Sequence, residues 1–166
     1  MVEWPKKRFW EKVSTVCVDE VNHYKVYLDQ RLLNTPNKKP LILPTKEMAN
    51  LVVLEWKSQG DKVDPLTMPY TRSANSAIDK VAPQIEEIRK LVTDYGDSDL
   101  ICYRADRPKE LVRRQEQIWS NLVLWSASEL NSPLNVFEGV VYAPQPVQSI
   151  LEFEKQVSNL NIFQLC

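Results

Sequence analysis

The spacing of apolar residues changes near residue 45, from a mainly strand-like to a mainly helix-like pattern, and this change restricts the possible folds more than any other feature. Before it, apolar side chains alternate with polar ones, as in Tyr24-Lys25-Val26-Tyr27-Leu28, which predicts antiparallel strands joined by short turns. After it, they recur at every third or fourth position, which predicts helices. The sequence therefore predicts an α+β protein: a β-rich domain with one or two helices over residues 1–80, then a mainly helical domain over residues 81–166.

Residues that begin or end helices divide the second part of the chain. Thr45 stands at an N-cap position, and Gly60 and Gly96 each stand where a helix is expected to end. The longest helix is expected from Pro108 to Leu130, and its apolar face is expected to fill a core. Asp106 is the expected N-cap of this helix, and Trp119 and Trp125 lie on its expected buried face. Four other elements are expected after residue 60: a short helix over 70–80, a helix over 83–96, a strand over 134–142 and a last helix through Leu160.

Two residue types are scarce, and their scarcity excludes several classes of protein. The chain of 166 residues has three glycines, at positions 60, 96 and 139, and one histidine, His23. Glycines this far apart cannot build a phosphate-binding loop, and one histidine cannot build a histidine-rich zinc site. A triad would need His23, which lies in an expected hairpin turn, so no catalytic site, cofactor or metal is expected and the chain is not expected to be an enzyme.

Charge and cysteine content indicate the setting in which the chain works. The net charge is −1 and the pI about 5.9, so no nucleic-acid partner is expected. The three cysteines are widely separated, which is typical of reduced thiols inside a cell, and Cys102 is expected to be buried. No apolar run is long enough for membrane insertion. The expected location is the bacterial cytoplasm, or the mitochondrial matrix if the chain is a processed eukaryotic one.

Three segments carry polar or aromatic residues that could form a site. Asp94, Asp97 and Asp99 crowd one loop and could hold a divalent metal, although a helix end followed by a capping aspartate is the favoured interpretation. Arg72 lies among small polar residues and could bind a carboxylate or phosphate. Alternatively, the segment is a tightly packed helix whose small residues let neighbouring elements approach. Trp4 and Trp10 could be exposed anchors for a partner or could cover the edge of the sheet.

An ordered set of segments over about Arg8 to Val157 resembles one known family. It includes Lys7-Arg8-Phe9-Trp10, Leu43-Pro44-Thr45 and Glu55-Trp56-x-x-Gln59-Gly60, and its most specific parts are Met68-Pro69-x-Thr71-Arg72-x-x-Asn75-Ser76-Ala77-Ile78-Asp79 and Tyr95-Gly96-x-Ser98-Asp99-Leu100-x-Cys102-Tyr103-Arg104-Ala105. The family is the assembly chaperone of F-type ATP synthase that attends the α subunit, found in mitochondria and α-proteobacteria. Gln30 departs from the glycine that bacterial relatives often have.

The resemblance implies an α+β domain followed by a helical domain, and chaperoning rather than catalysis. The implied partner is the unassembled α subunit of the catalytic head, whose apolar surface aggregates until the β subunit covers it. Family members continue past position 166 with further helices and an acidic segment. The chain also ends in an apolar stretch without a helix stop signal, so it is expected to lack the C-terminal part.

Six polar residues within the most specific segments are the candidates for partner binding. They support either the junction of the two expected domains or the surface that meets the client, and they are Arg72, Asn75, Asp79, Asp99, Tyr103 and Arg104. Two other functions stay open from the residues alone. One is a divalent-metal enzyme that uses Asp94, Asp97 and Asp99, and the other is a general peptide-binding module that uses the apolar C-terminal helix.

Overall fold

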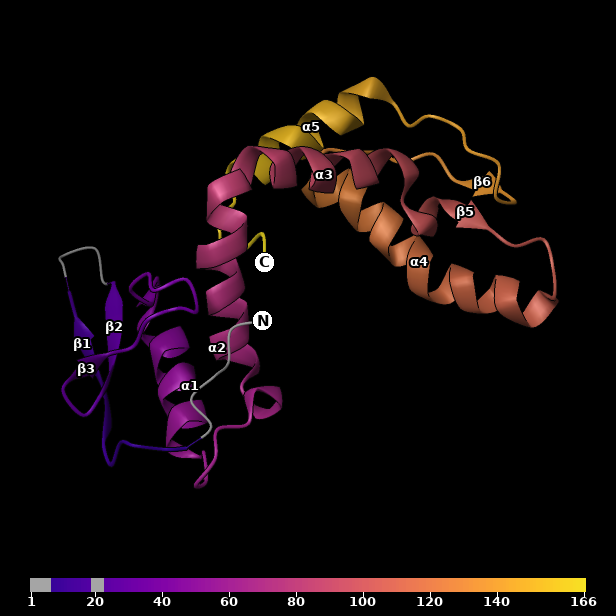
Figure 1. Ribbon diagram of the computed structural model, residues 1–166. Coiled ribbons are helices and arrows are strands. Elements are labelled where there is room, and N and C mark those ends of the chain that lie inside the picture. Colours follow the sequence, from indigo (N-terminus) through magenta and orange to yellow (C-terminus); the bar gives the residue numbers. More distant parts are fainter. Residues whose placement is uncertain (1–6, 19–22) are drawn as a thin grey trace. The chain divides into compact units, whose positions relative to one another are not determined.

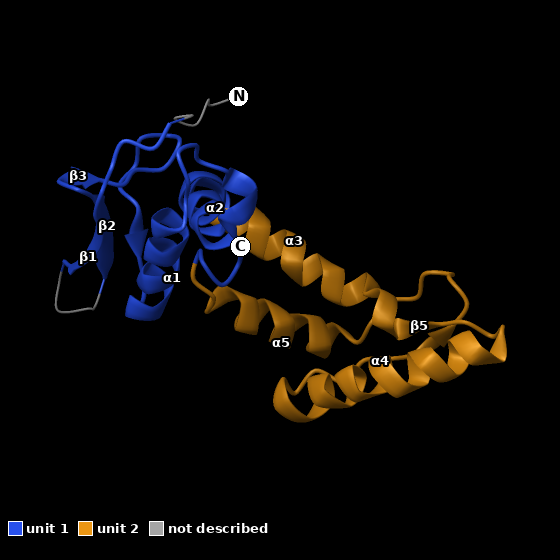
Figure 2. Ribbon diagram, turned by 90° about the horizontal axis from the view of Figure 1, so that it is seen from below, with its two compact units in different colours: residues 1–84, 162–166 blue, residues 85–161 orange. Residues whose placement is uncertain are grey.

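The computed structural model describes residues 7–18 and 23–166, and Trp4 lies outside this range. Contacts divide the chain into two compact units (Figure 2): unit 1 comprises residues 1–84 and 162–166, and unit 2 comprises residues 85–161. Unit 1 contains the antiparallel sheet, and most helical residues of the chain follow it, so the α+β prediction is confirmed. The domain division near residue 80 stays a prediction. Within the described ranges, no helix is long and apolar enough to cross a membrane.

The sheet of unit 1 is built around its second strand (Figure 1). Strand β1 (Val13–Cys17) pairs with β2 (Tyr24–Leu28), and β2 also pairs with β3 (Arg31–Leu32) and β4 (Ile42–Leu43), all antiparallel. The β1–β2 register brings Val13 opposite Leu28 and Cys17 opposite Tyr24. Asp29 turns the chain into β3 with φ 55°, a conformation that aspartate tolerates, and its Oδ1 accepts from the backbone N–H of Lys12 at 2.8 Å.

Helix α1 (Lys46–Lys57) covers one face of this sheet and completes the core of unit 1. Thr45 caps it as expected, because its Oγ1 accepts from the backbone N–H of Met48 at 3.1 Å. Trp56 of α1 packs edge-on against Trp10, with 5.0 Å between the ring centroids. Trp10 is 2% exposed and its indole N–H donates to the Trp56 carbonyl, so the exposed-anchor interpretation of Trp10 is wrong. A tryptophan burying both its ring and its N–H stabilises a core rather than an interface.

Glu55 and Gln59 connect α1 to the next helix through buried hydrogen bonds. Helix α2 (Pro69–Ser76) begins with a proline, which has no N–H, and the next two N–H groups, of Tyr70 and Thr71, donate to the Glu55 carboxylate at 2.6 and 2.8 Å. Gln59 holds the intervening loop and η1 (Pro65–Thr67), since its side chain accepts from the Asp64 N–H at 2.7 Å. The segment Glu55-Trp56-x-x-Gln59 therefore fixes both the start of α2 and the loop before it to the end of α1.

Helix α2 continues without a break into turns of different pitch. A π-helical turn, η2 (Ala77–Val81), and a 3₁₀ turn, η3 (Ala82–Gln84), follow it and lead to α3 (Ile85–Ser98) of unit 2. The short helix expected over 70–80 and the helix expected over 83–96 are both present. Gly96 lies inside α3 rather than at its end, so its interpretation as a helix stop is wrong.

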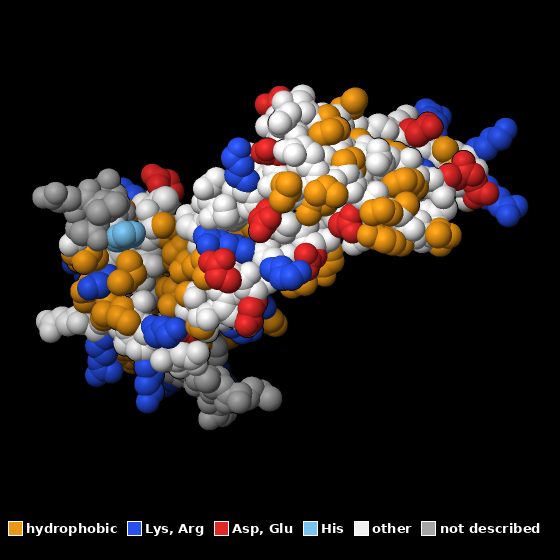
Figure 3. Space-filling model, turned by 90° about the horizontal axis from the view of Figure 1, so that it is seen from above, with side chains coloured by type: hydrophobic (Ala, Val, Ile, Leu, Met, Phe, Trp, Pro, Cys, Tyr) orange, Lys and Arg blue, Asp and Glu red, His pale blue; other side chains and the backbone are white. Residues whose placement is uncertain are grey.

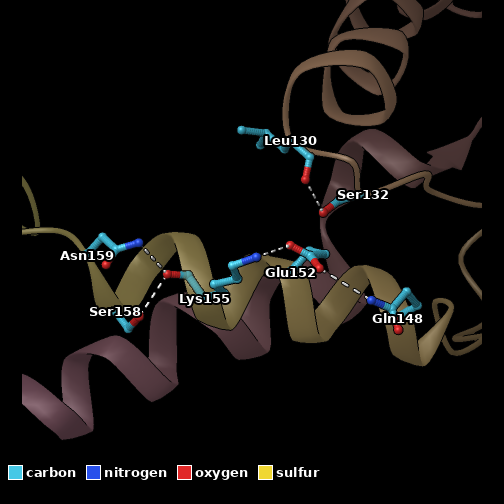
Figure 4. Close-up of polar contacts among 7 residues, drawn as sticks. All are labelled: Leu130, Ser132, Gln148, Glu152, Lys155, Ser158 and Asn159. Atoms are coloured by element: carbon cyan, nitrogen blue, oxygen red, sulfur yellow. Dashed lines mark hydrogen bonds and ion pairs between the residues drawn. The ribbon is translucent and has the colours of Figure 1, made fainter.

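In unit 2, α3 packs along α5 (Val147–Ser158) (Figures 1 and 2), and Gly96 of α3 lies beside Phe153 of α5. A β-carbon built on Gly96 would lie 2.7 Å from Cδ2 of Phe153. Side chains of Ser158 and Asn159 donate to the Lys155 carbonyl at 2.8 and 3.1 Å and close the last turn of α5 (Figure 4). These polar groups end the helix, although the sequence there has no glycine or proline.

Helix α4 (Lys109–Glu129) occupies the range expected for the longest helix but differs from the expectation in two ways. The N-cap is Pro108, without a side-chain hydrogen bond, so the assignment of Asp106 as N-cap is wrong. Its apolar face is not a core: Ile118 is 53% exposed and Trp125 52%, and within the described part of the chain Ser126 is the buried residue of this helix. The periodicity predicted the helix correctly, but it could not show whether another element covers the face.

Two short strands and the chain end complete the described structure. The 3₁₀ turn η4 (Leu100–Cys102) leads into strand β5 (Tyr103–Arg104). Strand β5 pairs in parallel with β6 (Phe137–Glu138). Of the strand expected over 134–142, only residues 137–138 are in a β-strand. The strand ends at Gly139, whose φ of 85° is not an extended conformation. The apolar chain end is part of unit 1, where the partly buried Phe163 packs against the core.

Candidate functional site

Two sets of three residues contain the candidates for partner binding, one in each unit. Arg72, Asn75 and Asp79 lie on α2 and η2 of unit 1, at positions three and four residues apart, and so share one side of the helix. Asp99, Tyr103 and Arg104 lie on and beside η4 and β5 of unit 2. Their role in binding a partner stays a prediction, and the environment of each side chain shows what else it does.

In the unit 1 set, Asp79 makes hydrogen bonds within the protein, whereas the Arg72 side chain has no partner among the described residues. Asp79 accepts from the Thr35 hydroxyl at 2.8 Å and from the Asn37 N–H at 3.1 Å, so it holds the loop between β3 and β4. Asn75 is 8% exposed. Arg72 is exposed, and its guanidinium makes no hydrogen bond or ion pair with residues 7–18 or 23–166. Arg72 is therefore available for a carboxylate or phosphate of a partner.

Internal contacts hold the unit 2 set in place. Asp99 caps η4 by accepting from the Ile101 N–H at 2.9 Å. Arg104 donates to the Gln115 carbonyl at 3.0 Å and lies over the Trp119 ring, 5.3 Å from its centroid. The Tyr103 ring packs against Phe137, and its hydroxyl is buried without a hydrogen-bond partner among the described residues. These contacts join β5 to α4 and β6.

The loop expected to hold Asp94, Asp97 and Asp99 is wrong, because Asp94 and Asp97 lie in the last turns of α3 and Asp99 directly follows that helix. Each of the three aspartates has a partner other than a metal. Asp94 forms an ion pair with Lys90 at 2.5 Å, and Asp99 caps η4. Asp97 accepts from the Tyr142 hydroxyl at 2.5 Å and from the Gln145 N–H at 2.8 Å. Across the ranges that the structure describes, no group of three His, Cys, Asp or Glu residues is arranged to hold a metal ion. The geometry favours the capping interpretation of this segment over the metal site.

The Asp97–Tyr142 hydrogen bond should be visible in a pH titration of unit 2. The Tyr142 hydroxyl and the Gln145 N–H lower the pKa of Asp97, and the Asp97 carboxylate raises the pKa of Tyr142. A lowered folded-state pKa contributes stability that is present above the unfolded pKa, about 3.9 for aspartate, and is lost as the pH falls through the folded value. In Tyr142→Phe we expect the Asp97 pKa to rise toward its ordinary value, as measured by carboxyl NMR.

The matched control for this titration is Tyr95→Phe. Tyr95 lies on α3, is 61% exposed, and its hydroxyl has no hydrogen-bond partner in the described structure. Its removal should leave the Asp97 titration unchanged. An equal Asp97 midpoint in the wild-type chain and in Tyr142→Phe would contradict the assigned hydrogen bond.

Unit 2 also has an apolar cavity and an apolar surface that the sequence did not predict. The cavity, about 280 Å³, lies where Leu122 and Trp125 of α4 approach Ile101, Gly96 and Phe153. Side chains of Leu111, Ile118 and Leu122 are 41 to 53% exposed along the same helix. Figure 3 shows hydrophobic side chains at the surface of both units. Surface of this kind binds other apolar surface.

No reactive cysteine is apparent at these sites. Cys102 is fully buried, as expected, and burial raises the pKa of its thiol, which keeps it protonated and unreactive. Cys17 and Cys166 are exposed, and neither is in a disulfide. Among the six candidate residues, Asp79, Asp99 and Arg104 thus make contacts within the described structure, and Arg72 is exposed.

Comparison with known proteins identifies the family. Residues 7–127 match the model of the ATP12 chaperone protein family, and this range covers well over half of the chain. The chain belongs to the ATP12 chaperone family. This result confirms the resemblance inferred from the sequence motifs, and it places the chain among chaperones for ATP synthase assembly.

Solved structures of ATP12 relatives share the fold. A point mutant of Atp12p from Paracoccus denitrificans is 43% identical, with a TM-score of 0.88 over 95% of this chain and 67% of that protein. Atp12 from the same organism is 42% identical over 96% of this chain and 68% of that protein. The Atu1473 protein of Agrobacterium tumefaciens is 34% identical, with a TM-score of 0.87 over 96% of this chain and 59% of that protein.

Proposed function

We propose that this ATP12 family member binds the unassembled α subunit of the F-type ATP synthase head and prevents its aggregation until it pairs with the β subunit. The observation that carries the proposal is the family match over residues 7–127, which spans the sheet, α1 to α3 and most of α4. Exposed apolar side chains on both units support it, because such surface can cover apolar surface of a client. The bacterial cytoplasm or the mitochondrial matrix is the proposed location.

The proposed mechanism is reversible binding without a chemical step. An α subunit that has not met its partner exposes apolar surface and aggregates. A chaperone bound to that surface lowers the concentration of the aggregation-prone form, and the β subunit then displaces the chaperone by mass action. The sequence has no clustered glycines for a phosphate loop, and Asp94, Asp97 and Asp99 at the end of α3 are engaged in structural contacts. We therefore propose binding rather than catalysis.

Aggregation of purified α subunit, followed by light scattering, tests this function. The chain should suppress aggregation of isolated α subunit and should have no effect on the assembled head. Suppression of unrelated aggregating proteins to the same degree would contradict the specificity for α. Failure to bind isolated α subunit in a pull-down would contradict the proposal itself.

Arg72 offers a variant that tests the partner-binding prediction in the same assay. Because its guanidinium is exposed and unpaired within the described structure, Arg72→Ala should leave stability within about 0.5 kcal/mol of wild type. If Arg72 meets a carboxylate of the client, the variant should bind α subunit severalfold more weakly. Lys62→Ala, which removes an exposed cation from the loop before η1, is the control and should bind normally. Equal binding by both variants would remove Arg72 from the site.

A further inference from the structure

A groove lies between α3 and α5 of unit 2, where two cavities meet. The first, of about 380 Å³, extends to Glu154, and the second, of about 420 Å³, extends to Val147. Asp94 of α3 and Ile150 of α5 line both cavities, so the two are contiguous. Volumes of this size are typical of ligand pockets. We call the two cavities together the α3–α5 groove.

The cations on both helices are already paired within unit 2. Three cations lie on α3 and α5, and each forms an ion pair with an acidic residue three or four positions away: Arg89 with Glu86, Lys90 with Asp94, and Lys155 with Glu152 (Figure 4). Arg89 also donates to the Leu160 carbonyl at 3.0 Å, and its Nε is buried without a hydrogen-bond partner among the described residues. None of these cations is therefore available to neutralise a further acidic group.

Acidic side chains exceed the basic ones in the groove. Among the described residues that line it, four carboxylates face two cations: Glu86, Asp94, Asp97 and Glu154 face Arg89 and Lys90. The neutral Tyr142 hydroxyl and Gln145 N–H donate to Asp97. Glu154 forms no hydrogen bond or ion pair with residues 7–18 or 23–166. The groove is therefore negatively charged, and Glu154 is a carboxylate in it that has no partner in the described structure.

A buried hydroxyl in the same groove also lacks a partner. Thr93 lines the first cavity and is 7% exposed, and its hydroxyl forms no hydrogen bond with any residue that the structure describes. Buried hydroxyl groups normally have a hydrogen-bond partner. Ser158, by contrast, lines the same cavity and donates its hydroxyl to the Lys155 carbonyl at 2.8 Å. An unpaired carboxylate and an unpaired hydroxyl in one cavity are suited to a ligand that carries positive charge and donates hydrogen bonds.

We propose that the α3–α5 groove binds a lysine or arginine side chain of the client. This inference rests on the proposed chaperone function and assigns part of its binding surface. The charged end would donate to the Glu154 carboxylate and the Thr93 hydroxyl, and the aliphatic stem would lie along Ile150. Apolar neighbours of the basic residue would lie on Val147, which is 75% exposed, and on Leu151, which is 52% exposed.

Charge complementarity favours this occupant over other kinds of ligand. An acidic segment would add to the excess of carboxylates in the groove, and a purely apolar segment would remove water from Glu154 without replacing its hydrogen bonds. A metal ion needs several ligating side chains, and the described residues include no group of three that could hold one. A basic residue flanked by apolar residues fits both the charge and the apolar lining of the groove.

Charge reversal at Glu154 tests the proposal with isolated α subunit as the ligand, measured on the immobilised chain. Glu154→Lys should weaken binding of α subunit by at least about tenfold, because the new ammonium group repels the basic side chain. Glu87→Lys is the matched control, because Glu87 is an exposed, unpaired glutamate of α3 that lines neither cavity. Its reversal should change binding by less than about twofold. Equal effects of the two reversals would overturn the proposal and leave the chaperone function intact.

Thr93→Val gives a second readout that does not depend on net charge. Valine has nearly the shape of threonine, and the substitution removes an unpaired hydroxyl, so the variant should unfold at the same denaturant concentration as wild type. Loss of the hydroxyl should weaken binding of α subunit by at least about threefold. Normal binding by Thr93→Val would overturn the contact with this hydroxyl, and normal binding by both Thr93→Val and Glu154→Lys would overturn the proposal.

A peptide tests the groove independently of the α subunit. If α subunit does not bind at all, the proposed function fails, and the probe is a synthetic peptide with one lysine between two leucines. The same peptide with glutamine in place of lysine is its control. Amide NMR shifts of Thr93 and Ile150 with the lysine peptide alone would support the site, and equal shifts or none with the two peptides would overturn it. Shifts at Thr93 that grow with the concentration of the chain alone would assign the groove to a second copy and overturn the client assignment.

Discussion

Replacing Glu55 with alanine should lower the free energy of unfolding of unit 1 by about 3 kcal/mol. The Glu55 carboxylate is buried and accepts three hydrogen bonds: from the N–H groups of Tyr70 and Thr71, and from the Thr71 hydroxyl at 2.6 Å. Alanine would leave two N–H groups at the start of α2 and one hydroxyl without acceptors, and the Thr71 N–H and hydroxyl among them are buried. Each buried orphan group costs about 1–3 kcal/mol, and a lost helix cap about 1 kcal/mol.

Denaturant unfolding followed by tryptophan fluorescence, to which the buried Trp10 and Trp56 of unit 1 contribute, measures this loss. Glu47→Ala is the matched control, because Glu47 is an exposed glutamate on the same helix, and its loss should change stability by at most about 0.5 kcal/mol. Glu55→Gln should lie between the two, since the amide keeps one acceptor oxygen. A Glu55→Ala chain as stable as Glu47→Ala would show that Glu55 does not hold α2.

Replacing Gly96 with alanine should destabilise unit 2 although alanine favours a helix. Within α3 the substitution alone would add about 1 kcal/mol of helix propensity. The new methyl group, however, would lie 2.7 Å from Cδ2 and 3.1 Å from Cε2 of Phe153, so α5 or the ring must move. Overpacking of this kind costs about 1–3 kcal/mol, which exceeds the propensity gain. We expect a net loss of about 1–2 kcal/mol in chemical unfolding.

Gly60→Ala is the matched control for this experiment. A β-carbon on Gly60 meets nothing within 4 Å, and the backbone there is not in the left-handed region, so stability should change by at most about 0.5 kcal/mol. In a double-mutant cycle, Phe153→Leu should relieve part of the Gly96→Ala loss, because the smaller side chain leaves room for the methyl group. Additive effects of the two substitutions would contradict the close packing of α3 on α5.

Local patterns predicted most elements because they depend on neighbours in the chain. Strict alternation located β2 at Tyr24–Leu28, and an N-cap residue located the start of α1 after Thr45. The family resemblance also came from local segments, which residues 7–127 of the family match confirm. The residues that the six candidate side chains contact could not be derived from local patterns. Asp79, for example, bonds to Thr35, 44 positions earlier, and such pairs follow from topology alone.

The sequence by itself determined the α+β class, the order of the main helices and of the strands of the N-terminal sheet, and the ATP12 family, because alternation, caps and motifs act over a few residues. Only the tertiary structure decided the roles of particular residues. It showed that Gly96 lets Phe153 approach rather than ending a helix, that Trp10 is core, and that Trp125 is half exposed. A helical stripe records which residues share a face, whereas burial depends on which distant element packs there.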